Sequence, residues 1–305
     1  MAVIPSLPPP SPPPPSPPSA PLAPAVAVAP VASAGWFADP WRIAPYRWWD
    51  GHRWTPYLGG PTQVAAPVAL PLQTLPLRAA WVVLGALFLS IGSDRLYVDR
   101  VSSSDWPVWT LILGSVVLGY GPALAAGIFA LRRWGTGRWR DSIGLWFKPV
   151  DFAWGPLAWV SIYVGNIVLA VIITVTHLPI SSNVRGVGTS RLGRSVLLPL
   201  ALVAVVAAPI IEELLFRGII LRAFRSRMAF LPSVVLQGIF FGLCHMSVAY
   251  GAGNLGLVIV LSWVGTAFGC VALWLRRIGP TMLAHGMFNG VVFLILWLAP
   301  HALAR

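Results

Sequence analysis

Long, uninterrupted runs of apolar residues dominate this chain and restrict what it can fold into. Hydrophobic residues make up 57% of its 305 residues and charged residues only 10%, whereas a soluble domain carries roughly 25% charged residues. Inside a bilayer the backbone must satisfy its own hydrogen bonds, so apolar runs of about 20 residues predict membrane-spanning helices. We therefore expect an all-α fold, a polytopic membrane helix bundle.

Seven candidate spans are present, and the last four hold every residue to which we assign chemistry below. They are residues 77–93, 106–131, 152–175, 195–216, 231–249, 255–275 and 281–298. The first is the weakest, because it is short and is bounded by Arg78 and Asp94. The fourth helix is expected to run past Arg217 to about Phe224. We expect residues 77–194 to form an N-terminal group of spans, and residues 195–299 a second membrane domain that holds the residues to which we assign chemistry.

The positive charge of the chain indicates its orientation in the membrane. A net charge of +12 can be typical of nucleic-acid binding, but here the basic residues lie in short clusters between apolar runs. Basic loops stay in the cytoplasm, and with the N-terminus inside, 15 of the 21 Lys and Arg residues lie on that side. We expect a multi-pass protein of the cell membrane, with a cytoplasmic N-terminus, an extracellular C-terminus and no nucleic-acid partner.

The residues before the first span divide into three parts. Residues 1–34 are rich in Pro, Ala and Ser, which is typical of a disordered spacer, and show no cleavable signal peptide. Residues 35–58 are rich in Trp, contain the hairpin signal Asp50-Gly51, and are similar to a short Trp-Asp-Gly-x-x-Trp domain of unknown function. So few residues must depend on stacked aromatic rings, whether the unit is a docking module or only a mini-fold. Residues 59–76 are predicted to be a linker.

Two adjacent carboxylates carry the strongest chemical signal. Glu212 and Glu213 are the only glutamates, and they end an apolar run. A carboxylate at membrane depth costs ~2.5–3.5 kcal/mol on insertion scales, so a functional role is the default interpretation. Arg217 follows Glu213 by one helical turn and can pair with it, whereas Glu212 points about 100° away. Pro209 should kink the helix beside the pair. The alternative is a charge cluster that serves only topology.

Two histidines and an asparagine interrupt the later apolar segments. His245 lies four residues after Phe241, and His285 lies four residues before Asn289, so each pair shares a helix face. Either histidine alone is more often a partner in an interhelical hydrogen bond. Polar groups on three helices need one another or water at membrane depth, so we expect them to converge in a cavity.

These residues resemble the motifs of the CAAX prenyl protease type II, or CPBP, family of intramembrane proteases. The motifs Glu-Glu-x-x-x-Arg, Phe-x-x-x-His and His-x-x-x-Asn stand here at residues 212–217, 241–245 and 285–289. The resemblance covers about residues 198–299. It implies an endopeptidase, a hydrolase that cleaves a peptide bond in a conical cavity open towards the cytosol.

The resemblance also implies a role for each motif residue. The catalytic residues would be Glu212, His245, His285 and Asn289, with Glu213, Arg217 and Phe241 in support. Glu212 would act as general base on a water that His245 also holds, while His285 and Asn289 would stabilise the oxyanion. A peptide or protein substrate, with or without a lipid group, is expected to reach this site within the bilayer.

Several alternatives stay open at this point. A zinc ion bound by Glu212, His245 and His285 could run the same hydrolysis. The polar groups could instead relay protons in a transporter, or the chain could be a scaffold without activity. We favour hydrolysis without a required cofactor, because Asn289 is a poor zinc ligand but a good oxyanion donor.

Overall fold

The structure is a computed structural model that describes residues 33–59, 74–101, 106–184 and 197–299. The chain divides into two compact units, Met1–Pro71 and Leu72–Arg305, which we describe separately. Most of the Pro-rich tail and of the predicted linker lie outside the described residues, so those two predictions stay predictions.

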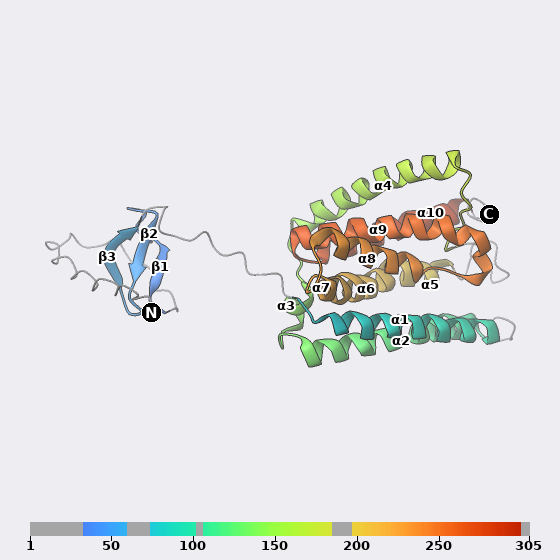
Figure 1. The fold of residues 1–305 in the computed structure, drawn as a ribbon, viewed down its shortest axis with the longest axis horizontal. Coiled ribbons are helices and arrows are strands. Elements are labelled where there is room, and N and C mark those ends of the chain that lie inside the picture. Colours follow the sequence, from blue (N-terminus) through green and yellow to red (C-terminus); the bar gives the residue numbers. More distant parts are fainter. Residues whose placement is uncertain (1–32, 60–73, 102–105, 185–196, 300–305) are drawn as a thin grey trace, which may run out of the picture. The chain divides into compact units, whose positions relative to one another are not determined.

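A three-stranded antiparallel sheet makes up the described part of the first unit (Figure 1). Its strands β1 (Gly35–Ala38), β2 (Tyr46–Trp49) and β3 (Trp54–Gly59) lie in the order β1-β2-β3. The turn between β2 and β3 contains Asp50-Gly51, as the sequence indicates. Gly51 has a φ of 97°, a backbone conformation that residues with a Cβ rarely adopt.

Tryptophan rings cover both faces of this sheet. Trp49 and Trp54 are register partners whose ring centroids lie 5.4 Å apart, edge to face. Trp36 and Trp48 form a similar pair at 5.5 Å, on the opposite face because neighbouring strand residues alternate. The stacked aromatic rings thus take the place of a conventional core.

Asp39 holds the loop between β1 and β2. Its buried carboxylate accepts hydrogen bonds from the backbone N–H groups of Ile43 and Ala44, at 2.9 and 3.0 Å, and from Arg47 Nε at 2.9 Å. Burial alone would raise the pKa of Asp39, but these hydrogen bonds outweigh it and hold the pKa below its ordinary value of 3.8. The folded loop therefore favours the ionised carboxylate.

The second unit is a bundle of long helices (Figure 1). Its elements are α1 (Leu77–Val101), α2 (Val108–Trp134), α3 (Trp139–Ile143), α4 (Asp151–Val175), α5 (Leu197–Leu202), η2 (Val203–Ala207), α6 (Ala208–Glu213), η3 (Leu214–Ile220), α7 (Leu221–Phe224), α8 (Phe230–Leu243), η4 (Val248–Gly253), α9 (Asn254–Leu275) and α10 (Gly279–Leu298). Six helical segments among the described residues are long and apolar enough to cross a membrane. The fold is the expected all-α, multi-pass membrane bundle.

Two of the expected spans have different limits in the structure. Helix α1 continues to Val101, so Asp94 lies inside the helix and does not end it. Helix α8 has 14 residues and covers about 21 Å, less than the ~30 Å of a bilayer core. The segment then turns at Cys244 and continues through the 3₁₀ helix η4, which lies beside the chain that follows α4, because Ser181 N–H bonds to the Gly253 carbonyl. The chain thus still passes from one end of the bundle to the other here, although α8 alone is too short.

The helix that carries both glutamates, Leu197–Phe224, ends at Phe224 as expected. We call it the glutamate helix. Two π-helical turns, η2 and η3, interrupt it. In η2 the Ala208 N–H bonds to the Val203 carbonyl, five residues earlier. The same winding would pair the Ala204 carbonyl with residue 209, but Pro209 has no N–H. The Ala204 carbonyl therefore needs another donor.

The two ends of the bundle differ in charge. Helices α2, α7 and α9 end, and helices α4 and α10 begin, at the end that holds the larger arginine clusters. There Arg277, just after α9, donates to Asp151 at the start of α4 at 2.8 Å. We call this the basic end. The last residue of α10, Leu298, lies at the opposite end (Figure 1).

Candidate active site

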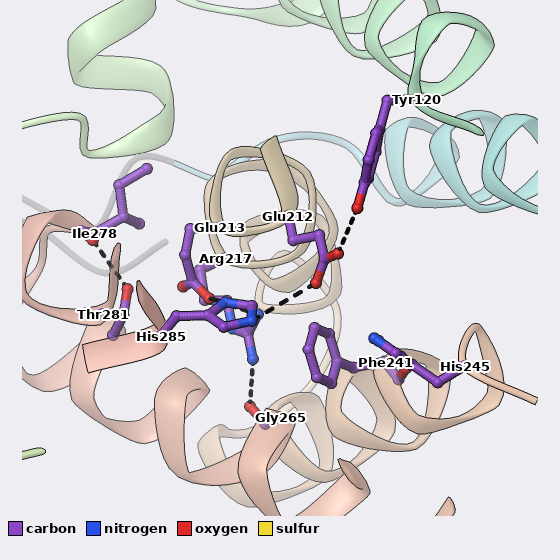
Figure 2. A network of polar contacts seen from close by, with 10 residues as sticks. All are labelled: Tyr120, Glu212, Glu213, Arg217, Phe241, His245, Gly265, Ile278, Thr281 and His285. Carbon is purple, nitrogen blue, oxygen red and sulfur yellow. Dashed lines mark hydrogen bonds and ion pairs between the residues drawn. The ribbon is translucent and has the colours of Figure 1, made fainter. Parts of the chain in front are cut away.

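The polar centre of the bundle lies where the glutamate helix meets α10 (Figure 2). Glu213 Oε1 accepts hydrogen bonds from Arg217 Nη1 at 2.8 Å and from His285 Nδ1 at 3.0 Å. The side chains of Glu213 and Arg217 are both 0% exposed. Arg217 also donates to the Gly265 carbonyl on α9 at 3.2 Å and lies 4.6 Å over the Phe241 ring of α8. The ion pair of Glu213 and Arg217 that their spacing predicts is thus present. Its contacts connect the glutamate helix with α8, α9 and α10.

Glu212 faces away from this ion pair and towards a cavity. Its Oε1 accepts a hydrogen bond from the Tyr120 hydroxyl of α2 at 2.9 Å. Its Oε2 is buried, has no hydrogen-bond partner among the residues that the structure describes, and lies 3.8 Å from His285 Nε2. Since a carboxylate oxygen can only accept, His285 Nδ1 carries a proton towards Glu213, which leaves Nε2 to face Glu212. The two glutamates thus contact opposite nitrogens of one imidazole.

His245 lines the same cavity without touching Glu212. It follows the end of α8, and its Nδ1 donates to the Phe241 carbonyl at 2.7 Å. Figure 2 shows the Phe241 ring between the two imidazoles, and its centroid lies 4.8 Å from His245 and 5.8 Å from His285. No hydrogen bond or ion pair joins His245 to Glu212 in the described part of the chain. The structure thus brings Glu212 and His285 together and places His245 behind an aromatic ring.

Asn289 has a structural partner that the sequence did not indicate. Its Nδ2 donates to the Ala204 carbonyl at 2.6 Å, the carbonyl that Pro209 leaves without a backbone donor. The amide thereby connects α10 to the π-turn η2. This bond uses one N–H of the NH₂ group, which carries two donors, and Asn289 is also among the residues that line the cavity.

The cavity has a volume of about 280 Å³, and Glu212, His245, His285 and Asn289 are all among the residues that line it. The rest of its lining is apolar apart from Tyr120 and Asn183. From these four residues it extends towards the end of the bundle opposite the basic end, where Asn183 lies after α4 and Val292 lies in the second half of α10. The cavity therefore extends away from the basic end of the bundle.

The three residues expected as zinc ligands are not arranged as a site. Glu212 and His285 approach each other, but His245 lies on the far side of Phe241 (Figure 2). Within the four described ranges, no group of three or more His, Cys, Asp or Glu side chains is placed to hold a metal ion. The geometry of these residues does not fit a three-ligand centre.

Tyr120 is the contact that sequence reasoning missed. It lies in α2, outside the motif-bearing spans, between Gly119 and Gly121. Tyrosine is amphipathic and common in membrane helices, so a single Tyr in an apolar run is no signal of function. Only the packing of α2 against the glutamate helix shows that its hydroxyl reaches Glu212.

Comparison with known proteins agrees with the motifs. Residues 194–291 match the family described as Type II CAAX prenyl endopeptidase Rce1-like. No curated protein and no solved structure matches the chain significantly. The matched segment includes the glutamate helix, α8, α9 and the part of α10 that carries His285 and Asn289. Residues 194–291 therefore form a domain of the type II CAAX prenyl endopeptidase family, and the chain is a membrane-spanning protease.

Proposed function

We propose that Glu212 is the general base that activates a water molecule for peptide-bond hydrolysis in the cavity. One observation carries the proposal: Glu212 Oε2 is buried and without a hydrogen-bond partner among the described residues, and it faces His285 Nε2 at 3.8 Å in the cavity wall. Both atoms are hydrogen-bond acceptors, so a water molecule that donates one hydrogen to each would satisfy both. That water would be held with a lone pair directed into the cavity, towards a substrate carbonyl.

The ion pair beneath this water has a supporting role in the proposal. The Glu213 carboxylate, held by Arg217, fixes the tautomer and the ring orientation of His285. Tyr120 holds the other oxygen of Glu212 and so directs Oε2 towards the cavity. Glu212 and His285 thus act on the water, while Glu213, Arg217 and Tyr120 are positioning residues.

We assign Asn289 and His245 to hydrogen bonds with the substrate. The second N–H of the Asn289 amide donates to the oxygen that becomes negative in the tetrahedral intermediate. His245 donates Nδ1–H to the Phe241 carbonyl, so its Nε2 is left as an acceptor for a substrate backbone N–H. The family implies that His245 holds the water and that His285 stabilises the oxyanion. We assign the water to His285 instead, because His285 is the histidine beside Glu212. No metal ion has an obligatory role, since a carboxylate and an imidazole can activate water unaided.

The test is peptide cleavage by the purified full-length protein in liposomes, with a quenched-fluorescent peptide library and product identification by mass spectrometry. We expect Glu212→Gln to reduce turnover by ~10² to 10⁴. The matched control is Asp99→Asn, which neutralises an exposed carboxylate on α1 and should leave cleavage unchanged. Full turnover by Glu212→Gln would refute the assignment. Activity that is lost on metal removal and restored by zinc would replace the metal-free mechanism.

A further inference from the structure

We propose that one face of the three-stranded sheet in the first unit binds a proline-rich segment, and that its occupant is residues 8–18 of the same chain. This inference does not depend on the proposed protease mechanism, because it concerns the unit Met1–Pro71 alone. Three observations carry it: the loop between β1 and β2 lies on the other face of the sheet, the first face is aromatic and uncharged, and the chain supplies a segment of matching chemistry.

The loop between β1 and β2 lies on the face of the sheet that holds Trp49 and Trp54. Trp49 is 4% exposed. Trp41, from the loop, lies edge to face with Trp54 at 6.3 Å. The Arg47 guanidinium lies over the Trp41 ring at 4.9 Å and pairs with Asp39 at 2.9 Å. We call this the loop face, and its rings serve as the core of the unit.

The opposite face is built from aromatic rings that keep part of their surface accessible. Trp36 and Trp48 are register partners on it, and both are partly exposed. Tyr57 of β3, two residues before Gly59, is 39% exposed. A Cβ on Gly59 would lie 3.0 Å from the Trp36 ring, so that ring reaches from β1 across β2 to β3. We call this surface, with Trp36, Tyr46, Trp48 and Tyr57, the aromatic face.

The aromatic face carries no charged side chain in the described strands. Strand alternation adds only Ala38 and Gly59 to its four rings. One ion pair of the unit lies on the loop face, and the other joins Arg53 to Asp50 in the turn between β2 and β3. Binding to an anionic lipid surface relies on Lys and Arg beside the apolar residues, and this face offers none. An uncharged surface of Trp and Tyr rings instead fits proline-rich segments, which dock in aromatic-lined grooves.

Residues 8–18 have this chemistry and lie within reach. Nine of these eleven residues are proline, a composition that favours the polyproline II helix, which loses little entropy on binding. Residues 1–32 contain no Asp, Glu, Lys or Arg, so the segment is as uncharged as the face.

The spacing along the chain allows the segment to fold back onto the sheet. Pro18 stands 17 residues before Gly35, a separation that spans roughly 20–25 Å as a flexible chain. A four-residue strand is only about 13 Å long. Because the segment is tethered, its effective concentration at the face is on the order of 1 mM. Even weak docking is therefore largely occupied.

Binding of the segment as a separate peptide tests the proposal. A fluorescein-labelled peptide with the sequence of residues 7–19 is titrated, with fluorescence anisotropy as the readout, into the full-length protein in detergent and into a variant that lacks residues 2–24. We expect the shortened variant to bind the peptide. The full-length protein should bind it ~10-fold more weakly, the factor expected when the tail at ~1 mM competes with a peptide whose Kd is ~0.1 mM. A control peptide with alanine in place of each proline should bind neither.

Two neighbouring residues of β3 provide matched variants. Tyr57 and Leu58 are 39% and 46% exposed, and they lie on opposite faces because adjacent strand residues alternate. In the shortened variant, Tyr57→Ala should weaken peptide binding ~5- to 10-fold, because an aromatic contact is lost, whereas Leu58→Ala should leave binding unchanged. Hydrogen exchange of residues 33–59 checks that both variants keep the sheet. If Tyr57→Ala loses that protection, Tyr57→Leu replaces it, since it removes the ring and keeps an apolar side chain.

Hydrogen exchange also locates the tail in the full-length protein. The backbone N–H groups of β2 and β3 should exchange more slowly there than in the shortened variant. The proposal is overturned if the shortened variant does not bind the peptide, if both proteins bind it equally, or if Tyr57→Ala and Leu58→Ala weaken binding alike. Protection that disappears when the protein is diluted would place the tail on a second copy of the chain and refute the intramolecular contact. Protection that requires vesicles with anionic lipid would show that the face binds the membrane instead.

Discussion

Replacing each glutamate by glutamine should separate a catalytic carboxylate from a structural one. Both substitutions keep the shape of the side chain and remove its charge. The Glu212 side chain is 13% exposed at the cavity, and the amide can still accept the hydrogen bond from Tyr120. We therefore expect Glu212→Gln to fold with a melting temperature within a few degrees of the wild type, and to lose activity by ~10² to 10⁴.

Glu213→Gln should act mainly on stability. It leaves the Arg217 guanidinium, which is 0% exposed, without its counter-ion, and breaking a buried pair in this way costs about 3–5 kcal/mol. The Phe241 and Phe268 rings, 4.6 and 5.2 Å from Arg217 Cζ, still contact the cation and offset part of this cost. At ~3 kcal/mol, and ~2–4 °C per kcal/mol for a unit of this size, the melting temperature should fall by roughly 6–12 °C.

The assay compares thermal unfolding in detergent with peptide cleavage for both variants. The control is the double variant Glu213→Gln/Arg217→Met, which removes both charges and should recover most of the lost stability. If Glu212→Gln proves the unstable variant, while Glu213→Gln is as stable as the wild type but inactive, the two roles have been assigned the wrong way round.

Three further outcomes are expected. Tyr120→Phe should lower turnover ~10- to 100-fold with little change in melting temperature, because it removes one hydrogen bond to the charged Glu212. Asn289→Ala should destabilise the bundle, because the Ala204 carbonyl loses its donor. The loss should be smaller when Pro209→Ala is added, because residue 209 then supplies a backbone N–H to that carbonyl. If the effects of the two substitutions on thermal unfolding are additive, Asn289 and Pro209 are not coupled in this way. Since the folded-state pKa of Asp39 lies below the ordinary 3.8, its contribution to the first unit is complete above that pH and declines as the pH falls below it. Hydrogen exchange of residues 33–59 should follow this decline, and Asp39→Asn should abolish it.

Much of the architecture could be predicted because the bilayer restricts it. Apolar runs of span length can only be helices in lipid, so the bundle and the extension of the glutamate helix to Phe224 followed from composition and length. The pairing of Glu213 with Arg217 followed as well, since residues four apart on a helix are neighbours whatever surrounds them. Local rules of this kind do not depend on the rest of the fold.

The length of α8 and the partner of Asn289 could not be predicted in this way. Hydropathy does not distinguish a helix from an apolar turn. Residues 231–249 were therefore predicted to be one span, although α8 ends at Leu243. The Asn289 amide binds Ala204 because Pro209 and a π-turn leave that carbonyl unpaired. That partner lies 85 residues away, and no local pattern connects the two.

By itself, the sequence determined the class of fold, the segments that carry ionisable groups and the family of the protease. These depend on composition, helical spacing and short motifs. Only the tertiary structure decided that His285, and not His245, lies beside Glu212, that Tyr120 holds the second carboxylate oxygen, and that the cavity extends away from the basic end. The physical reason is that each of these depends on how separate helices are rotated and shifted against one another, and many weak side-chain contacts together set that arrangement.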